Sequence, residues 1–272
     1  MICNAGRNYL VFKSNGQVFR CQCHQETPLG DMGDLDQWFP QVALSCPLME
    51  ECQRSHPGEW HRASRLDDQG KAVDRGSLSG QPDNEVVTRI FLTGETMRSQ
   101  EEWCFLFERL ARRFKKCWHR IEGDDPADFP GIAQLVEKVS FLGDQLLYVS
   151  DLSSRKTRIV DVLSKASVDC VRFTAVVNPS APGFNEIKVL GRLRLIHERG
   201  FKVNAVMPGN MATFYLFEPF FEKFSSKYGI PMTFIPEVEF PEHMQERLGI
   251  LKQMGSSPAV SKTDEQDSFS GL

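Results

Sequence analysis

The 272-residue sequence contains no apolar run approaching the roughly 20 residues that a membrane-spanning helix requires. Its first residues, Met1-Ile2-Cys3, lack the basic segment and apolar region of a secretory signal, so we expect a cytoplasmic protein. A basic excess is lacking too, since the net charge is -4 and the isoelectric point is about 5.9. No Ser-His-Asp or Walker-type constellation is present. We therefore expect neither a membrane nor a nucleic acid as a partner.

Cysteine, by contrast, is concentrated at one end of the chain. The composition is otherwise that of a soluble globular protein, with 41% hydrophobic and 25% charged residues, and the length favours two domains over one. In a reducing compartment, clustered cysteines indicate metal or redox chemistry more than disulfides. Five of the eight cysteines lie in the first 52 residues, namely Cys3, Cys21, Cys23, Cys46 and Cys52.

The spacing within this segment predicts a metal site. Apolar runs on either side of Asn15-Gly16, a strong turn pair, predict a β-hairpin that brings Cys3 and Cys21 close together. Four thiols on two loops can close around one soft metal, and unligated buried thiols are the alternative. The predicted ligands are Cys3, Cys21, Cys46 and Cys52, with Cys23 or His24 as a substitute, whereas His56 and His61 are predicted to be exposed. Ligand type alone does not separate an iron-sulfur cluster from zinc.

Composition and periodicity divide the chain into four parts. Residues 63–84 have almost no large apolar side chains, which predicts a linker. The parts are the cysteine-rich module at 1–62, this linker, an alternating strand and helix region at 85–240, and a partly disordered tail at 241–272.

The alternating region predicts an α/β fold with a parallel sheet. Strands are expected at 86–92, 118–121, 145–150, 170–177, 201–207 and 232–236. Helices are expected at 100–116, 131–139, 157–165, 185–198 and 214–228. Six strand-helix units suit an open three-quarter (βα)6 barrel, and an open doubly wound sheet is the alternative.

The N-terminal motif resembles a known family. The motif has twelve residues between Cys3 and Gly16 and four between Gly16 and Cys21. This spacing is similar to the opening of the SPASM or Twitch modules of radical S-adenosylmethionine (radical SAM) enzymes, and "PLGDM" resembles their usual Leu-Gly-Asn segment. Those modules with seven cysteines hold two clusters, so five cysteines fit a single cluster of the Twitch kind. The resemblance implies a [4Fe-4S] cluster and favours iron over zinc.

The later region resembles the radical SAM barrel. The segment "RIEGDDPADFPGIAQLVEKV" is similar to the end of that family's second strand, which contacts the amino group of S-adenosylmethionine. Gly123, Asp124, Asp125 and Pro126 take the places of the family's Gly-Gly-Glu-Pro, and Ser150-Asp151 stands where the third strand commonly ends in Thr-Asn. A helix N-cap explains Asp125 or Asp128 equally well.

One element of that family is missing. Its first strand is followed by Cys-x3-Cys-x2-Cys, whereas here the segment from Ile90 to Arg98 contains no cysteine. Without those thiolates, reductive cleavage of S-adenosylmethionine should fail, whatever cosubstrate pocket remains. The other thiols, Cys104, Cys117 and Cys170, are interpreted as core or surface residues.

The order of the parts is reversed relative to the family, where the barrel precedes the module. Either the start of a longer protein has been lost or split off, or this is a stand-alone arrangement. The favoured hypothesis is an iron-sulfur protein with a degenerate barrel. It would serve as an electron-transfer or substrate-holding part beside a competent radical SAM barrel or an upstream-encoded half. The substrate would be a peptide or a small molecule. The alternatives are an active radical SAM enzyme that uses the module cluster and a zinc-stapled binding protein without a redox role.

Overall fold

The computed structural model of this chain describes residues 9–21, 27–38, 63–66, 72–74, 85–93, 97–123, 125–226 and 228–236. Several predicted site residues lie outside these ranges, among them Cys3, Cys23, Cys46, Cys52 and Asp124. The same holds for His24, His56, His61 and the predicted tail. Within the described ranges, no helix has the length and apolarity needed to cross a membrane.

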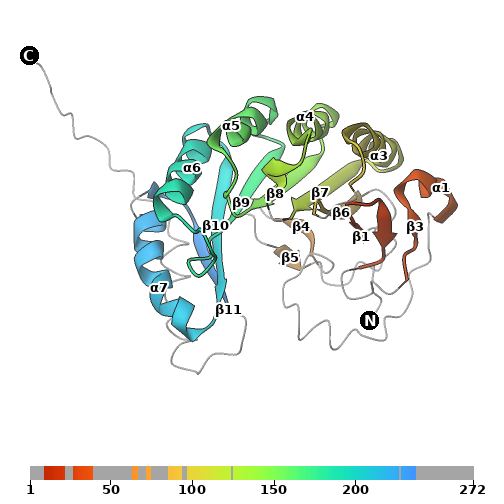
Figure 1. The fold of residues 1–272 in the computed structure, drawn as a ribbon. Helices are drawn as coiled ribbons and strands as arrows, with labels where there is room; N and C mark the ends of the chain where they lie inside the picture. The colour runs from red at the N-terminus through yellow and green to blue at the C-terminus, as the bar shows by residue number, and fades with distance from the viewer. Residues whose placement is uncertain are drawn as a thin grey trace, which may run out of the picture.

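One curved sheet runs through the molecule, with strands in the order β11-β10-β9-β8-β7-β6-β1-β2-β3 (Figure 1). Strands β6 to β11 are parallel and follow chain order. They are β6 (Glu85–Phe91), β7 (Lys116–Glu122), β8 (Gln145–Ser150), β9 (Val171–Val176), β10 (Lys202–Gly209) and β11 (Met232–Pro236). The predicted mixed α/β fold with a parallel sheet is therefore confirmed.

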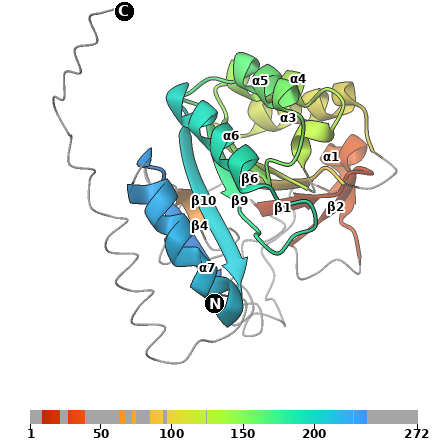
Figure 2. The ribbon, with the colours of Figure 1, turned by 60° about the vertical axis from the view of Figure 1, so that its left-hand side comes forward.

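A helix follows each of the first five of these strands. The helices are α3 (Gln100–Arg113), α4 (Ile132–Leu142), α5 (Lys156–Lys165), α6 (Glu186–Glu198) and α7 (Met211–Phe221), which continues as a π-helix over Glu222–Ser226. Figure 2 shows these helices along the outer side of the sheet, with α7 beside β10. A doubly wound sheet would require the strand order to reverse at one point, and no such reversal occurs from β6 to β11. The count of six complete strand-helix units stays a prediction.

The N-terminal segment joins the same sheet. Strand β1 (Tyr9–Phe12) pairs in parallel with β6, and β2 (Gln17–Phe19) pairs antiparallel with β1. Strand β3 (Gly30–Asp31) pairs antiparallel with β2, and a 3-10 turn at Met32–Asp34 leads into α1 (Leu35–Trp38). The described part of residues 1–62 is thus continuous with the strands of the 85–240 region, and the predicted domain limits stay predictions.

The predicted linker at 63–84 contains two short strands. Strand β4 (Ala63–Leu66) pairs antiparallel with β5 (Ala72–Asp74). A two-stranded pair uses backbone donors and acceptors and needs no run of large apolar side chains, so composition indicated only a linker.

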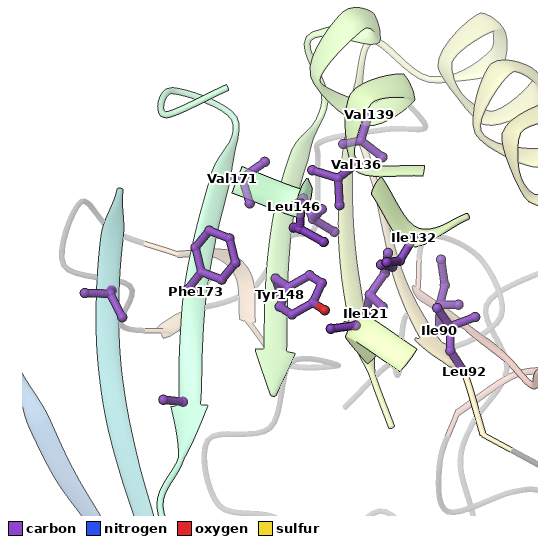
Figure 3. Packing of buried hydrophobic residues seen from close by; sticks show 14 of the residues in the cluster. Ile90, Leu92, Ile121, Ile132, Val136, Val139, Leu146, Tyr148, Val171 and Phe173 are labelled. Carbon is purple, nitrogen blue, oxygen red and sulfur yellow. The ribbon is translucent and has the colours of Figure 1, made fainter. Parts of the chain in front are cut away.

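The main core lies between the sheet and the outer helices. Alternate strand residues point to this side, including Ile90, Ile121, Tyr148 and Phe173, and Val136 of α4 belongs to the same cluster (Figure 3). The rings of Tyr148 and Phe173, on neighbouring strands, have centroids 5.2 Å apart.

Helix α3 shows why the sequence pattern was informative. Its start is a capping box, in which the Ser99 hydroxyl accepts from the Glu102 N–H and the Glu102 carboxylate accepts from the Ser99 N–H. The predicted apolar face, Trp103, Phe107, Leu110 and Phe114, is buried, as expected for residues spaced three and four apart. Each such side chain contributes about 1.5–3 kcal/mol through burial.

Candidate functional site

The carboxyl ends of β6 and β7 meet at Gly123, the first residue of the predicted S-adenosylmethionine segment. A Cβ at Gly123 would lie 2.8 Å from the Leu92 carbonyl oxygen and 2.9 Å from Thr93 Cγ2. The Leu92 N–H also donates to the Glu122 carbonyl oxygen, at 2.9 Å. The close approach of these two strand ends therefore explains this glycine without a ligand.

Asp125 ties β7, β8 and the following loops together. The residue as a whole is 5% exposed, and one carboxylate oxygen accepts from the Ala127 N–H at 3.0 Å and the Ser150 hydroxyl at 2.9 Å. The other oxygen accepts from the N–H and the hydroxyl of Ser154, both at 2.7 Å. Asp125 is also the N-cap of a 3-10 turn at Pro126–Asp128, so the N-cap interpretation holds for this residue.

These contacts decide what else Asp125 can bind. A carboxylate offers about four lone-pair directions, and four donors occupy them here. An ammonium group could bind only by displacing one of those donors. The predicted contact of Asp125 with a cosubstrate stays a prediction, and the structure supplies a structural role for the residue.

The loop after β8 holds an unusual backbone conformation at the same end of the sheet. Leu152 has a φ of 58°, in the left-handed region that non-glycine residues rarely occupy, and its N–H donates to the Ser150 hydroxyl at 2.8 Å. Nearby, burial raises the pKa of Tyr148, with smaller contributions from the charges of Asp125 and Asp128. Strained backbone and buried ionisable groups gather at functional loops, which makes this end of the sheet the candidate site.

A row of basic side chains crosses the inner face of the sheet. The pairing register places Arg89 beside Arg120, Arg120 beside Leu147, Leu147 beside Arg172, and Arg172 beside Lys202. Residues opposite one another in a ladder point to the same face, and the adjacent residues Ile90, Ile121 and Phe173 point to the helices. The four basic residues therefore lie on the face turned away from the helices.

One acidic residue, Glu122, interacts with two members of this row. Its carboxylate accepts from Nε and Nη2 of Arg89 and, at 3.0–3.1 Å, from Arg120. On the same face, burial lowers the pKa of Lys13, and the charge of Arg89 lowers it further. Four basic side chains thus gather on this part of the inner face, and basic side chains bind carboxylate and phosphate groups.

Cys21 is the predicted metal ligand that falls within the described residues. It follows β2, is 6% exposed and packs on the inner face with Tyr9, Val11, Phe19, Val87 and Trp118. This position lies closer to the amino ends of the parallel strands than the basic row does, because Val87 and Trp118 precede Arg89 and Arg120 on their strands. The predicted convergence of Cys21 with Cys3, Cys46 and Cys52 stays a prediction, because those three residues lie outside the described ranges.

A second group of chemically active residues was missed by the sequence interpretation. Cys117, interpreted from the sequence as a core or surface thiol, is buried, and its sulfur lies within 4.8 Å of a ligand atom of His119 and of Asp144. Burial, and then the charge and hydrogen bond of Asp144, raise the pKa of the Cys117 thiol. The pair Cys117 and His119, two apart on a strand, was a readable signal, whereas the approach of Asp144 required the fold. Cys104 and Cys170 are half-buried.

No family model matches this chain, and no curated protein matches it in sequence. Two crystal structures of Streptococcus suis SuiB are similar to it, one of them bound to S-adenosylmethionine. Each has 12% sequence identity and a TM-score of 0.48, and the matches cover 80% of this chain and 54% and 55% of the SuiB chains. This chain thus spans about half the length of those proteins.

Proposed function

We propose that this chain is an iron-sulfur protein related to the radical SAM superfamily, which holds one [4Fe-4S] cluster through its N-terminal cysteines. In this proposal it serves as an electron-transfer or substrate-holding part beside a competent radical SAM barrel. The observation that carries the proposal is the spacing of Cys3, Gly16 and Cys21, combined with the absence of Cys-x3-Cys-x2-Cys after β6.

The position of Gly16 supports this interpretation of the spacing. Gly16 occupies the hairpin turn with a φ of +88°, and a Cβ there would lie 2.5 Å from Arg98 Nε. The turn is bound to the segment that precedes α3, since the Arg98 N–H donates to the Ser14 carbonyl oxygen at 2.8 Å and Arg98 Nε donates to the Asn15 carbonyl oxygen at 2.9 Å. A glycine at this place in the motif therefore has a physical reason.

The same contacts support the view that the barrel does not cleave S-adenosylmethionine. The hairpin turn, through Ser14, also donates a hydrogen bond to the Thr93 carbonyl oxygen just after β6. The turn therefore contacts both ends of the connection in which the family carries its three cysteines. Together with the four donors on Asp125, these contacts support a role that does not require S-adenosylmethionine.

The basic row supports the substrate-holding part of the proposal. The row places four basic side chains, Arg89, Arg120, Arg172 and Lys202, on one face, and Glu122 accepts hydrogen bonds from two of them, Arg89 and Arg120. Such a face would orient an acidic peptide or a small molecule with a carboxylate or phosphate. Arginine suits this task because its planar guanidinium can bind an anion through two parallel hydrogen bonds.

The test is anaerobic reconstitution of the full-length chain with iron and sulfide. We expect about four iron and four sulfide per chain, with visible charge-transfer absorption. Cys21→Ser, which nearly preserves the volume of the buried side chain, should lower both contents. Cys104→Ser, a substitution of a half-buried thiol on α3, is the matched control and should leave them unchanged.

Other outcomes of the same preparation would overturn the proposal. Protein without iron, sulfide and visible absorption would exclude an iron-sulfur role. One equivalent of zinc in colourless protein, with chelator-induced unfolding of the N-terminal segment, would favour the zinc-stapled alternative. Formation of 5'-deoxyadenosine by the reduced protein alone would show that the chain cleaves S-adenosylmethionine by itself.

A further inference from the structure

Three potential metal ligands lie together in the core, away from the N-terminal cysteines. Cys117 and His119 are two apart on β7 and therefore point to the same, helix-facing side of the sheet. Asp144 immediately precedes β8, the next strand. The ligand atoms of the three side chains all lie within 4.8 Å of one another, and the residues are 0%, 1% and 5% exposed.

The hydrogen bonds of His119 leave one ring nitrogen facing the carboxylate. Its Nδ1 lies 2.7 Å from the Thr88 hydroxyl oxygen, and its Nε2 lies 3.5 Å from Asp144 Oδ2. Neither Nε2 nor Oδ2 has a hydrogen-bond partner among the described residues. If Nδ1 donates to Thr88, as the second ring nitrogen of a metal-bound histidine donates to a neighbouring oxygen, Nε2 presents a lone pair to Oδ2.

In this tautomer the lone pairs of Nε2 and Oδ2 face one another, and only a proton or a metal ion between them satisfies both. A proton would draw the two atoms to about 2.7–2.9 Å, the length of a charge-assisted hydrogen bond. The observed separation of 3.5 Å is longer. A tetrahedral zinc ion with nitrogen and oxygen ligands at about 2.0–2.1 Å would instead separate them by roughly 3.3–3.4 Å.

We propose that Cys117, His119 and Asp144 bind a zinc ion. The Cys117 sulfur, at about 2.3 Å from such an ion, would lie roughly 3.5–3.6 Å from the other two ligand atoms, so the site closes with shifts of about 1 Å. A thiolate, a carboxylate and Zn²⁺ sum to no net charge, which suits an apolar core. The ion would link the first half of β7 to the start of β8, beneath Phe107 of α3, whose ring centroid lies 4.5 Å from that of His119.

This site is independent of the proposed iron-sulfur function and is measured separately. The probe is zinc itself: the full-length protein is stripped with a chelator, reloaded with zinc, dialysed and assayed for metal per chain. Because the N-terminal cysteines can also take zinc, the informative quantity is the difference between variants. His119→Gln and Asp144→Asn should each hold one equivalent less than the wild type, whereas Cys104→Ser should hold the same amount.

A second measurement identifies the sulfur ligand. In cobalt-loaded protein, Cys117→Ser should remove near-ultraviolet absorption corresponding to one thiolate-cobalt bond, while Cys104→Ser should retain it. The far-ultraviolet circular dichroism of each variant checks the fold, and zinc contents are compared only among variants whose spectrum matches that of the wild type. Iron and sulfide contents should be equal in the wild type and His119→Gln.

Equal zinc contents in the wild type, His119→Gln and Asp144→Asn would overturn the proposal. The same conclusion would follow if nitrogen NMR of the zinc-treated protein showed a doubly protonated His119 ring, since a buried imidazolium-carboxylate pair would then supply the positive charge. Loss of one zinc in both ligand variants, with the control unchanged, would establish the site.

Discussion

Replacing Asp125 with Asn should destabilise the protein although the two side chains have nearly the same shape. The reason is that each carboxylate oxygen accepts from a backbone N–H, Ala127 on one side and Ser154 on the other. An amide has one acceptor oxygen, and its NH₂ group can only donate. Whichever way the amide is turned, one buried backbone N–H faces another donor.

The expected size follows from these contacts. A buried donor left without an acceptor costs about 1–3 kcal/mol, and the remaining hydrogen bonds lose the assistance of the charge, about 1 kcal/mol in total. The free energy of unfolding should therefore fall by about 2–4 kcal/mol. For a chain of this size, each kcal/mol lowers the melting temperature by about 2–4 °C.

The assay is urea unfolding followed by tryptophan fluorescence, with Asp128→Asn as the matched control. Asp128 lies three residues away and forms an ion pair with Arg158 at 2.6 Å, but both side chains are about half exposed. Such surface pairs contribute less than about 1 kcal/mol. If Asp125→Asn unfolded within about 0.5 kcal/mol of this control, the four-hydrogen-bond network would not hold the strand ends together, and the structural role assigned to Asp125 would be refuted.

Three further substitutions test the frame of the site by the same unfolding measurement. Gly123→Ala should cost about 1–3 kcal/mol, because the added Cβ would press on the backbone oxygen of Leu92; an unchanged free energy would show that the two strand ends separate freely. Ser99→Ala should lower the free energy of unfolding by about 1 kcal/mol by removing the N-cap of α3, whereas Ser99→Asp should retain most of the wild-type stability. Glu122→Gln should cost about 3–5 kcal/mol because it removes the charge of the buried carboxylate that pairs with Arg89, and a loss below about 1 kcal/mol would contradict a tight pair.

The strands and helices of the 85–240 region were largely readable from the sequence. Strands β8 and β11 have the predicted bounds, and helices α5 and α6 begin within one residue of the expected positions. Local rules decide these elements: apolar residues recur at helical or strand spacing, and Gly200 ends α6 in a left-handed conformation, with a φ of +86°. The parallel arrangement followed from strand-helix alternation in the same way.

The sequence by itself thus determined the order of strands and helices, the parallel sheet and the N-cap candidates. Only the tertiary structure decided that β1 pairs with β6, that four basic residues on separate strands form one row, and that Asp144 meets Cys117 and His119. These contacts join residues from different strands, and their pairing depends on the register and curvature of the whole sheet. Hydrophobic periodicity tells which face a residue is on, but the neighbour it meets on that face is set by the packing of the entire chain.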